Sequence, residues 1–353
     1  MLFVTILAFI GILGLLIFAH ELGHFLTAKA AGVKVEEFAF GFPPKLMSIK
    51  RGETRYSINL LPIGGYVKML GEEDPNHPRS LASKGALTRL VIMGAGSFMN
   101  LLLPIILFSI AFMIPAVVTK GDVQIEEVAP NSPAERAGID SGDIILSVND
   151  QPIENIPDLK NVILLNLGSK ITVGVEKEDG SQEKVSMIPR WNPPENEGAV
   201  GILIDMVHTY ESSESYPFWE AIPKGAQESW QTLALYRNAI ASLFVQKTLP
   251  QVSGPVGIFE ITEVATESGP SYLMRWAAFL SINLAIINLL PIPALDGGRI
   301  GFVLLEIVRR GKRISPQREK LIHLIGFVML MSLIVAITSF DILRLIRGES
   351  LVP

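Results

Sequence analysis

The sequence predicts a multi-pass α-helical membrane protein with a small membrane-associated β-sheet and one inserted domain outside the membrane. Hydrophobic residues make up 49% of the 353 residues and charged residues only 18%, and the mean hydropathy is +0.39. These values are typical of membrane proteins rather than of soluble enzymes. About 20 apolar residues suffice to cross a bilayer, and four stretches are long enough: Leu2 to about Ala31, Leu90–Val118, Trp276–Leu295 and Leu321–Phe340.

The overall charge and the absence of cysteine exclude several classes of function. A net charge of -5 and a pI near 5.7 argue against a nucleic-acid partner. Without cysteine, disulfides and thiolate metal sites are excluded, so any bound zinc must use nitrogen and oxygen ligands. Ala28-Lys29-Ala30 resembles a signal-peptide cleavage site, but the start lacks a basic segment and the apolar core is too long. We expect the first stretch to be a retained transmembrane helix.

A candidate metal site lies at the end of the first apolar stretch, in His20-Glu21-Leu22-Gly23-His24. In a helix, His20 and His24 are one turn apart on one face and can hold one metal ion between them. Glu21 lies beside that face, where its carboxylate can take a proton from a water molecule. This H-E-x-x-H pattern is typical of two zinc ligands with a general base. The alternative is a chance pair of histidines capping an apolar segment, but ionisable groups are costly there and are by default functional.

A catalytic zinc ion needs a third protein ligand, and Asp296 is the favoured candidate. It directly follows the uncharged third stretch and, because one and three crossings end on the same side, lies at the same membrane face as the histidine motif. A carboxylate left unpaired there would be costly, whereas a metal ion would stabilise its charge. Alternatives are that Asp296 is a solvated turn residue, or that His323 at the start of the fourth stretch approaches the site. His77 and His208 lie in a loop and in the acidic segment and are weaker candidates.

The distribution of charge predicts which face this is. The segment between the third and fourth stretches is strongly basic, with only Glu306 and Glu319 opposing its cations, whereas the long segment from Thr119 to Tyr272 is acidic. The positive-inside rule then places both termini and the long segment outside the cytoplasm, with the candidate site near the cytoplasmic face. The basic residues are Arg299, Arg309, Arg310, Lys312, Arg313, Arg318 and Lys320.

Residues 33–70 predict the small β-sheet next to the first helix. Turn signals at Gly41-Phe42-Pro43-Pro44 and Pro62-Ile63-Gly64-Gly65 separate candidate strands at Tyr56–Leu61 and Tyr66–Met69. Non-helical backbone near membrane depth is tolerated where it is buried in protein or lines a wet cavity. The alternative is a cytoplasmic hairpin without a role in the site.

Residues 120–206 predict a soluble module. A capped short helix at Asn131–Ile139 precedes a strand at Ile144–Val148, and a helix at Ile156–Leu167 precedes strands at Lys170–Glu176 and Glu183–Ile188. This order, most specific over Ala129–Ile153, resembles a bacterial-type PDZ domain, which binds peptide segments by strand addition. The alternative is a generic small α/β domain.

The predicted organisation has four regions. Phe218–Val245 is amphipathic but is interrupted by Arg237, which favours an interfacial or packing helix over a fifth span. The regions are 1–119 as the first half of a membrane core, 120–206 as the PDZ-like module, 207–272 as an amphipathic helical linker and 273–353 as the second half of the core.

Two motifs together resemble the site-2 protease family of intramembrane zinc metalloproteases, and among these the bacterial RseP-type proteases with one PDZ domain. They are the His20–His24 motif in the first stretch and Asn288-Leu289-Leu290-Pro291-Ile292-Pro293-Ala294-Leu295-Asp296-Gly297-Gly298 in the third, with the PDZ-like insert between. Ser253–Ile258 is similar to a further family segment. Gly94–Asn100 is similar to a second-span motif, although Ser97 stands where a proline is common.

The resemblance implies regulated intramembrane proteolysis in a bacterial plasma membrane. Zn²⁺ would be held by His20, His24 and Asp296, and Glu21 would activate water. Asn288 would help to hold an unwound substrate, and the strand that begins with Gly65, Tyr66 and Val67 would pair with it. The substrate would be a membrane protein with one transmembrane helix, of the anti-sigma-factor or signal-peptide-remnant type, and the PDZ-like module would bind peptide segments.

Two other functions remain open from the residues. A membrane metal transporter or sensor would use the histidines to carry ions, but it should place ligands in several spans and gives Glu21 no role. A non-catalytic PDZ scaffold would bind peptide tails and leave a membrane substrate uncut. A Glu21→Gln protein that keeps zinc but loses cleavage would favour the protease.

Overall fold

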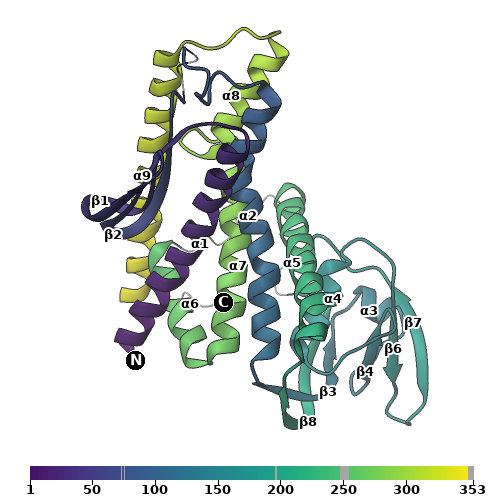
Figure 1. Cartoon of the computed structure of the whole chain (residues 1–353). Coiled ribbons are helices and arrows are strands. Elements are labelled where there is room, and N and C mark those ends of the chain that lie inside the picture. Colours follow the sequence, from purple (N-terminus) through teal and green to yellow (C-terminus); the bar gives the residue numbers. More distant parts are fainter. Residues whose placement is uncertain (73, 75, 195–196, 247–253, 349–353) are drawn as a thin grey trace. The chain divides into compact units, whose positions relative to one another are not determined.

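The computed structural model describes residues 1–72, 74, 76–194, 197–246 and 254–348 (Figure 1). The chain divides into two compact units. Unit 1 comprises Met1–Ala111, Phe218–Ala226 and the described part of Val252–Pro353, and unit 2 comprises Phe112–Pro217 and the described part of Gln227–Gln251. The helix α5 (Phe218–Gln246) contributes its first nine residues to unit 1 and the remainder to unit 2.

Unit 1 is predominantly helical, as the composition predicts. Among the described residues, four helices are long and apolar enough to cross a membrane, and α5 is not one of them. They are α1 (Leu2–Ala30), α2 (Ala86–Met113), α7 (Pro270–Leu289) and α9 (Pro316–Ile346). Two shorter helices, α6 (Pro255–Glu267) and α8 (Asp296–Val308), lie between them in the chain. Ser253 of the predicted motif Ser253–Ile258 lies outside the described residues, and the rest of that motif opens α6.

The predicted small sheet packs against α1. It consists of β1 (Val35–Arg51) and β2 (Thr54–Met69). Residues 37–40 pair with residues 65–68 on one side and with residues 55–58 on the other, and residues 45–51 pair with residues 54–59. The segment from Gly65 to Met69 therefore forms one edge of this sheet and residues 45–51 form the other.

The third apolar stretch ends earlier than predicted. The helix α7 ends at Leu289 rather than at Leu295, because Pro291 and Pro293 cannot continue an α-helix and restrict the residues before them. The chain then turns, and Asp296 becomes the first residue of α8. Asp296 is thus held by the start of a separate helix, not by the end of the span.

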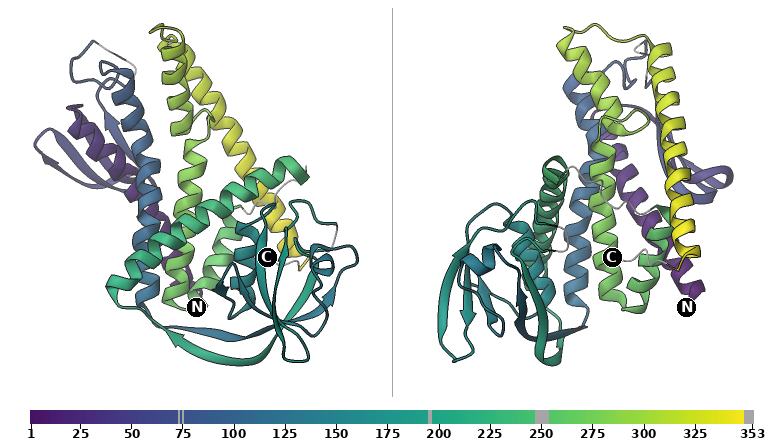
Figure 2. Two further views of the ribbon diagram at one scale, coloured as in Figure 1. Left: turned by 90° about the vertical axis from the view of Figure 1, so that its right-hand side faces the viewer. Right: turned by 180° about the vertical axis from the view of Figure 1, so that it is seen from behind.

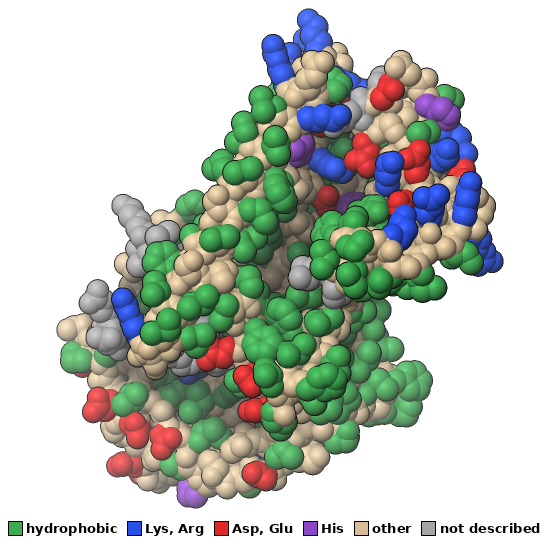
Figure 3. All heavy atoms as spheres, turned by 90° about the vertical axis from the view of Figure 1, so that its left-hand side faces the viewer, with side chains coloured by type: hydrophobic (Ala, Val, Ile, Leu, Met, Phe, Trp, Pro, Cys, Tyr) green, Lys and Arg blue, Asp and Glu red, His purple; other side chains and the backbone are tan. Residues whose placement is uncertain are grey.

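Large apolar side chains remain exposed over the helices of unit 1. The exposed set includes Leu2, Phe3, Leu87, Val91 and Met329, and α9 is almost entirely unburied over its most apolar window. Figure 3 shows hydrophobic side chains over the helices and basic side chains gathered near the β1–β2 sheet and the connection from α8 to α9. Contiguous apolar surface of this kind marks a site of membrane contact.

Unit 2 contains a six-stranded antiparallel sheet in the order β7-β6-β4-β3-β8, with β5 paired to β4. Its core is aliphatic and includes Val123, Ile145, Leu159 and Val173. Ser132 and Asn155 cap the helices α3 and α4 by accepting backbone N–H bonds. The elements are β3 (Ala116–Val128), α3 (Pro133–Arg136), β4 (Ile144–Val148), β5 (Gln151–Pro152), α4 (Ile156–Leu165), β6 (Ile171–Glu176), β7 (Gln182–Met187) and β8 (Ile202–Glu214).

Unit 2 extends beyond the soluble module drawn from the sequence. β3 begins before residue 120, and β8 continues past residue 206 to pair with it as far as Ala116 with Glu214. The described part of the 207–272 region accordingly begins as a strand and continues as α5. Residues 247–253 of that region lie outside the described residues.

Candidate active site

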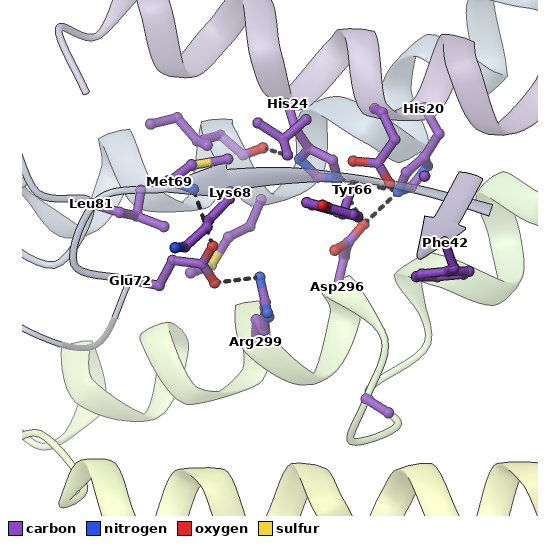
Figure 4. Close-up of a pocket in the computed structure, with 16 residues that line it drawn as sticks. His20, His24, Phe42, Tyr66, Lys68, Met69, Glu72, Leu81, Asp296 and Arg299 are labelled. Carbon is purple, nitrogen blue, oxygen red and sulfur yellow. Dashed lines mark hydrogen bonds and ion pairs between the residues drawn. The ribbon is translucent and has the colours of Figure 1, made fainter. Parts of the chain in front are cut away.

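Three side chains from two distant segments converge in unit 1. Nε2 of His20 lies 2.9 Å and Nε2 of His24 lies 3.2 Å from Oδ2 of Asp296, and the two Nε2 atoms are 3.2 Å apart. Both histidines are buried, and Asp296 is largely so. Figure 4 shows the two imidazoles from α1 and the carboxylate from α8 pointing toward one another. Among the described residues, this is the only group of three or more His, Cys, Asp or Glu residues arranged to hold a metal ion.

The ring of His24 is oriented by the backbone of α2. Its Nδ1 lies 2.8 Å from the carbonyl oxygen of Ile92. A carbonyl oxygen can only accept, so Nδ1 must donate its hydrogen, and in the neutral ring the Nε2 lone pair faces Asp296. Metal-binding histidines commonly make such a bond through their other nitrogen.

The ring of His20 is oriented by the side chain of Asn100, which also lies on α2. Its amide nitrogen lies 3.4 Å from Nδ1 of His20, while its Oδ1 is buried without a hydrogen-bond partner. Rotating the amide by 180° turns Oδ1 toward Nδ1 of His20, which can then donate to it and leave the Nε2 lone pair for a metal ion. The backbone carbonyl of Asn100 also accepts a 2.8 Å bond from Ser281 of α7.

The space around the cluster fits a metal ion. Gly96 of α2 faces the two imidazoles, and a Cβ atom at this position would overlap Nε2 of both His20 and His24. Only glycine leaves room there. Two imidazole nitrogens and one carboxylate oxygen also form a donor set that zinc accepts, and three protein ligands are typical of catalytic sites, where the fourth position takes water or substrate.

The helix α8, which presents Asp296, is tied down near its other end. The Glu306 carboxylate forms ion pairs with Arg89 of α2 at 2.7 Å and with Arg313 at 3.1 Å. Burial raises the pKa of the Glu306 carboxyl, but hydrogen bonds from Arg89 and Arg313 lower it more, so the pKa lies below its ordinary value. Glu306 therefore stays charged and fixes α8 against α2.

A cavity of about 480 Å³ adjoins the cluster. It is lined by His20, Glu21, His24, Asp296 and the sheet edge from Gly65 to Met69. The Cγ of Glu21 lies against Gly65, and the carboxylate faces the backbone amide of Val67. The candidate base is thus placed between the metal cluster and the free edge of the sheet.

Two of the residues that line the cavity form an ion pair, which Figure 4 shows. Arg299 of α8 pairs with Glu72 at 3.2 Å, and Glu72 accepts a 3.4 Å bond from the backbone N–H of Met69.

The other residues singled out from the sequence lie elsewhere. Asn288 is in the last turn of α7 and is not among the residues that line the cavity. His323 of α9 accepts a hydrogen bond from the backbone of Ala294 and does not join the metal cluster. His208 pairs with Asp122 in unit 2, and His77 lies in the loop after β2.

From the sequence, Gly96 and Asn100 were placed only within a motif of the second stretch and Arg299 only among the basic residues, and none of them was given a role at the site. The available signal was a small-residue run, Gly94-Ala95-Gly96, beside a polar Asn100 in an otherwise apolar span. Such residues permit close backbone approach, but their spacing does not say what approaches.

A buried cluster of two imidazoles and one carboxylate that could hold a metal ion, beside Glu21 and among apolar helices, is the arrangement expected of a membrane-embedded metal-dependent hydrolase. Residues 8–333 match the model of "Peptidase family M50", and the chain belongs to that family. It is a zinc metalloprotease of the membrane-embedded site-2 protease class.

Relatives agree with this assignment over nearly the whole chain. A putative zinc metalloprotease of Clostridium acetobutylicum is 37% identical over 96% of this chain and 96% of its own length. The Regulator of sigma-W protease RasP of Bacillus subtilis is 30% identical over 97% of this chain and 99% of its own length. The probable protease Eep of Enterococcus faecalis is 32% identical over 96% and 99%, respectively.

Proposed function

We propose that His20, His24 and Asp296 are the zinc ligands and that Glu21 is the general base of an intramembrane protease. The convergence of the three ligand atoms within 3.2 Å of one another, across 272 residues of sequence, is the observation that carries the proposal. When bound, zinc supplies Lewis-acid chemistry, because it polarises a carbonyl group and acidifies water. Gly96, the Ile92 carbonyl and Asn100 hold the two imidazoles in the orientation that this requires.

Glu21 has the position that proton transfer needs. Its carboxylate takes a proton from the attacking water and passes it to the nitrogen of the leaving amine, so that the peptide C–N bond breaks without forming an unstable amide anion. Its place between the ligands and the sheet edge brings the base next to a backbone bound at that edge. A transporter or sensor has no use for a carboxylate so placed.

The sheet edge at Gly65, Tyr66 and Val67 is proposed to bind substrate. A peptide bond within a transmembrane helix is protected by the hydrogen bonds of that helix, so the helix must unwind locally before hydrolysis. A free strand edge can replace the lost hydrogen bonds by strand addition. Asn288, at the last turn of α7, is proposed to hold the unwound segment on the other side, although it does not line the cavity in this conformation.

The substrate is proposed to be a membrane protein with a single transmembrane helix. The Bacillus subtilis relative is named Regulator of sigma-W protease RasP, a name that connects that protein with the regulation of sigma-W. By the same chemistry, a regulator of the anti-sigma-factor type or a signal-peptide remnant is the proposed substrate class here.

We further propose that α1, α2, α7 and α9 cross the plasma membrane, with the zinc site near the cytoplasmic face. The exposed basic residues Arg309, Arg310 and Lys312 follow α8, and the positive-inside rule supports this orientation. Unit 2 is then the PDZ-like module outside the cytoplasm. A cysteine placed at Arg310 that reacts with an impermeant reagent from outside intact cells would overturn this topology.

The test of the proposed function compares three purified proteins: wild type, Glu21→Gln and Asp296→Asn. We expect wild type to contain zinc and to cut a reporter with one transmembrane helix. Glu21→Gln should keep zinc but lose cleavage by about 100-fold or more, because a positioned base contributes 10²–10⁴-fold. Asp296→Asn should lose both. Normal cleavage by Glu21→Gln, or normal zinc content in Asp296→Asn, would contradict the proposal.

A further inference from the structure

The segment that delivers Asp296 is conformationally strained. Ala294, two residues before Asp296, has a φ of 84°, in the left-handed region that residues with a Cβ rarely adopt. Such a conformation persists only where the surroundings hold it. Ala294 also lines the cavity of the metal cluster. What holds Ala294 therefore helps to decide where the carboxylate of Asp296 lies.

Two contacts with α9 hold this segment. The backbone N–H of Ala294 donates a 2.9 Å hydrogen bond to Nδ1 of His323. One turn further along α9, a Cβ atom at Gly326 would overlap the Cβ and backbone oxygen of Pro293. The backbone of α9 is therefore packed directly against Pro293, the residue before Ala294. The ring of His323 also packs against Phe302 of α8 at 5.3 Å between centroids.

These contacts stand out because α9 is otherwise sparsely attached. Most of its apolar side chains are exposed. Near its other end, Asp341 accepts bonds from the backbone N–H groups of Gly254 and Gly257 at the start of α6. Figure 2 shows α9 as a long helix that reaches α6 at one end and lies beside α8 at the other.

We propose that His323 is a positioning residue for the third zinc ligand: it accepts the Ala294 N–H and, with Gly326, holds the strained turn that aims Asp296 at His20 and His24. The inference rests on the proposed metal site. A backbone N–H can only donate, so Nδ1 must be unprotonated, and the required feature of residue 323 is a hydrogen-bond acceptor at the Nδ1 position. His323 acts through the backbone and does not touch the metal.

The first test uses substitutions at His323 and measures zinc retention during titration with a chelator. We expect His323→Leu to bind zinc about tenfold or more weakly, the lower end of the effect of outer-shell partners on metal affinity. His323→Asn should recover most of the affinity, because its Oδ1 takes the place of Nδ1. His323→Gln, whose Oε1 lies nearer the Nε2 position, should not. The comparison of Asn with Gln stays informative even if the leucine variant fails to fold.

The second test perturbs the same turn from the backbone side. Gly326→Ala should weaken zinc binding, because its Cβ pushes Pro293 away. Gly301→Ala on α8 is the matched control, since a Cβ there meets no atom within 4 Å. It should leave zinc binding unchanged. In variants that still bind zinc at saturating concentration, we expect kcat to fall more than KM rises, because the defect lies at the metal and not in substrate binding.

Two results would overturn the inference. One is zinc affinity in His323→Leu equal to wild type, and the other is equal affinity in the Asn and Gln variants. The failure of the underlying metal site is distinguishable, because it would appear as normal zinc content in Asp296→Asn. Failure of this inference alone leaves Asp296→Asn depleted of zinc while His323→Leu retains it.

Discussion

At the scale of single residues, the candidate metal site depends on a glycine without a side chain as well as on the three proposed ligands. Gly96 lies where α2 faces the two imidazoles, and any side chain there would occupy the space next to both Nε2 atoms. His24 and His20 are oriented through their Nδ1 atoms by Ile92 and Asn100 of the same helix. One face of α2 therefore shapes the metal site without supplying a ligand.

Gly96→Ala tests this role of α2. The added methyl group should displace both imidazoles and lower zinc affinity by at least about tenfold, while the helix itself gains slightly in propensity. Gly94→Ala, on the same helix with no atom within 4 Å of the added Cβ, is the control and should bind zinc like wild type. Metal content after dialysis against a chelator measures the difference. Equal retention by the two variants would contradict the assignment.

At the scale of elements, one edge of the β1–β2 sheet lines the cavity and the other edge lies away from it. Gly65–Met69 lies on the cavity side, whereas residues 45–51 form the opposite, exposed edge. An unpaired edge is a template for another strand. The asymmetry predicts that substrate backbone pairs only at the first edge.

Cross-linking tests this asymmetry, and the natural chain helps because it contains no cysteine. In a Glu21→Gln background, which should hold substrate uncut, Tyr66→Cys should form a disulfide with a substrate cysteine near the scissile bond. Ile49→Cys on the opposite edge, which is 69% exposed, is the control. Gel electrophoresis under non-reducing conditions measures the product. Stronger cross-linking at position 49 than at position 66 would rule out the proposed edge.

At the scale of the whole molecule, the two units have separate cores. The buried aliphatic cluster of unit 2 lies entirely between Val123 and Ile204, and the metal cluster belongs to unit 1. The proposed zinc ligands and the proposed base therefore all belong to unit 1. This separation fits a module that selects substrates rather than one that performs chemistry.

Deleting residues 120–206 tests that division of labour. After the deletion β3 and β8 still pair from Ala116 with Glu214 to Thr119 with Glu211, so residues 207–210 can close the two strands as a short hairpin. The variant that lacks residues 120–206 should keep its zinc and still cut a reporter whose external part is small. We expect a reporter with a bulky external domain to be cut faster than by wild type. The test measures the cleavage rates of both reporters by the deletion variant and by wild type. If the ratio of the two rates is the same in both proteins, residues 120–206 do not select substrates.

Much of this organisation could be predicted from local patterns. Apolar runs long enough to span a membrane, the one-turn spacing of His20 and His24 and the capped short helix at Asn131–Ile139 all depend on neighbours within a few residues. The third apolar stretch was predicted at Trp276–Leu295, whereas the helix α7 runs from Pro270 to Leu289. The prediction followed the apolar run past Pro291 and Pro293, which end the helix. Asp296 was chosen by its chemistry, by counting crossings and by its place in the Asn288–Gly298 motif, but none of these shows how close its carboxylate lies to His20 and His24.

The sequence by itself therefore determined that the chain is a membrane protein with an H-E-x-x-H motif at the end of its first apolar stretch, because hydropathy and helical periodicity are properties of short segments. Only the tertiary structure decided that Gly96 clears the metal site, that Asn100 orients His20 and that α9 holds the turn before Asp296. Each of these is a contact between segments far apart in the chain, and its energy depends on distances that no local pattern encodes.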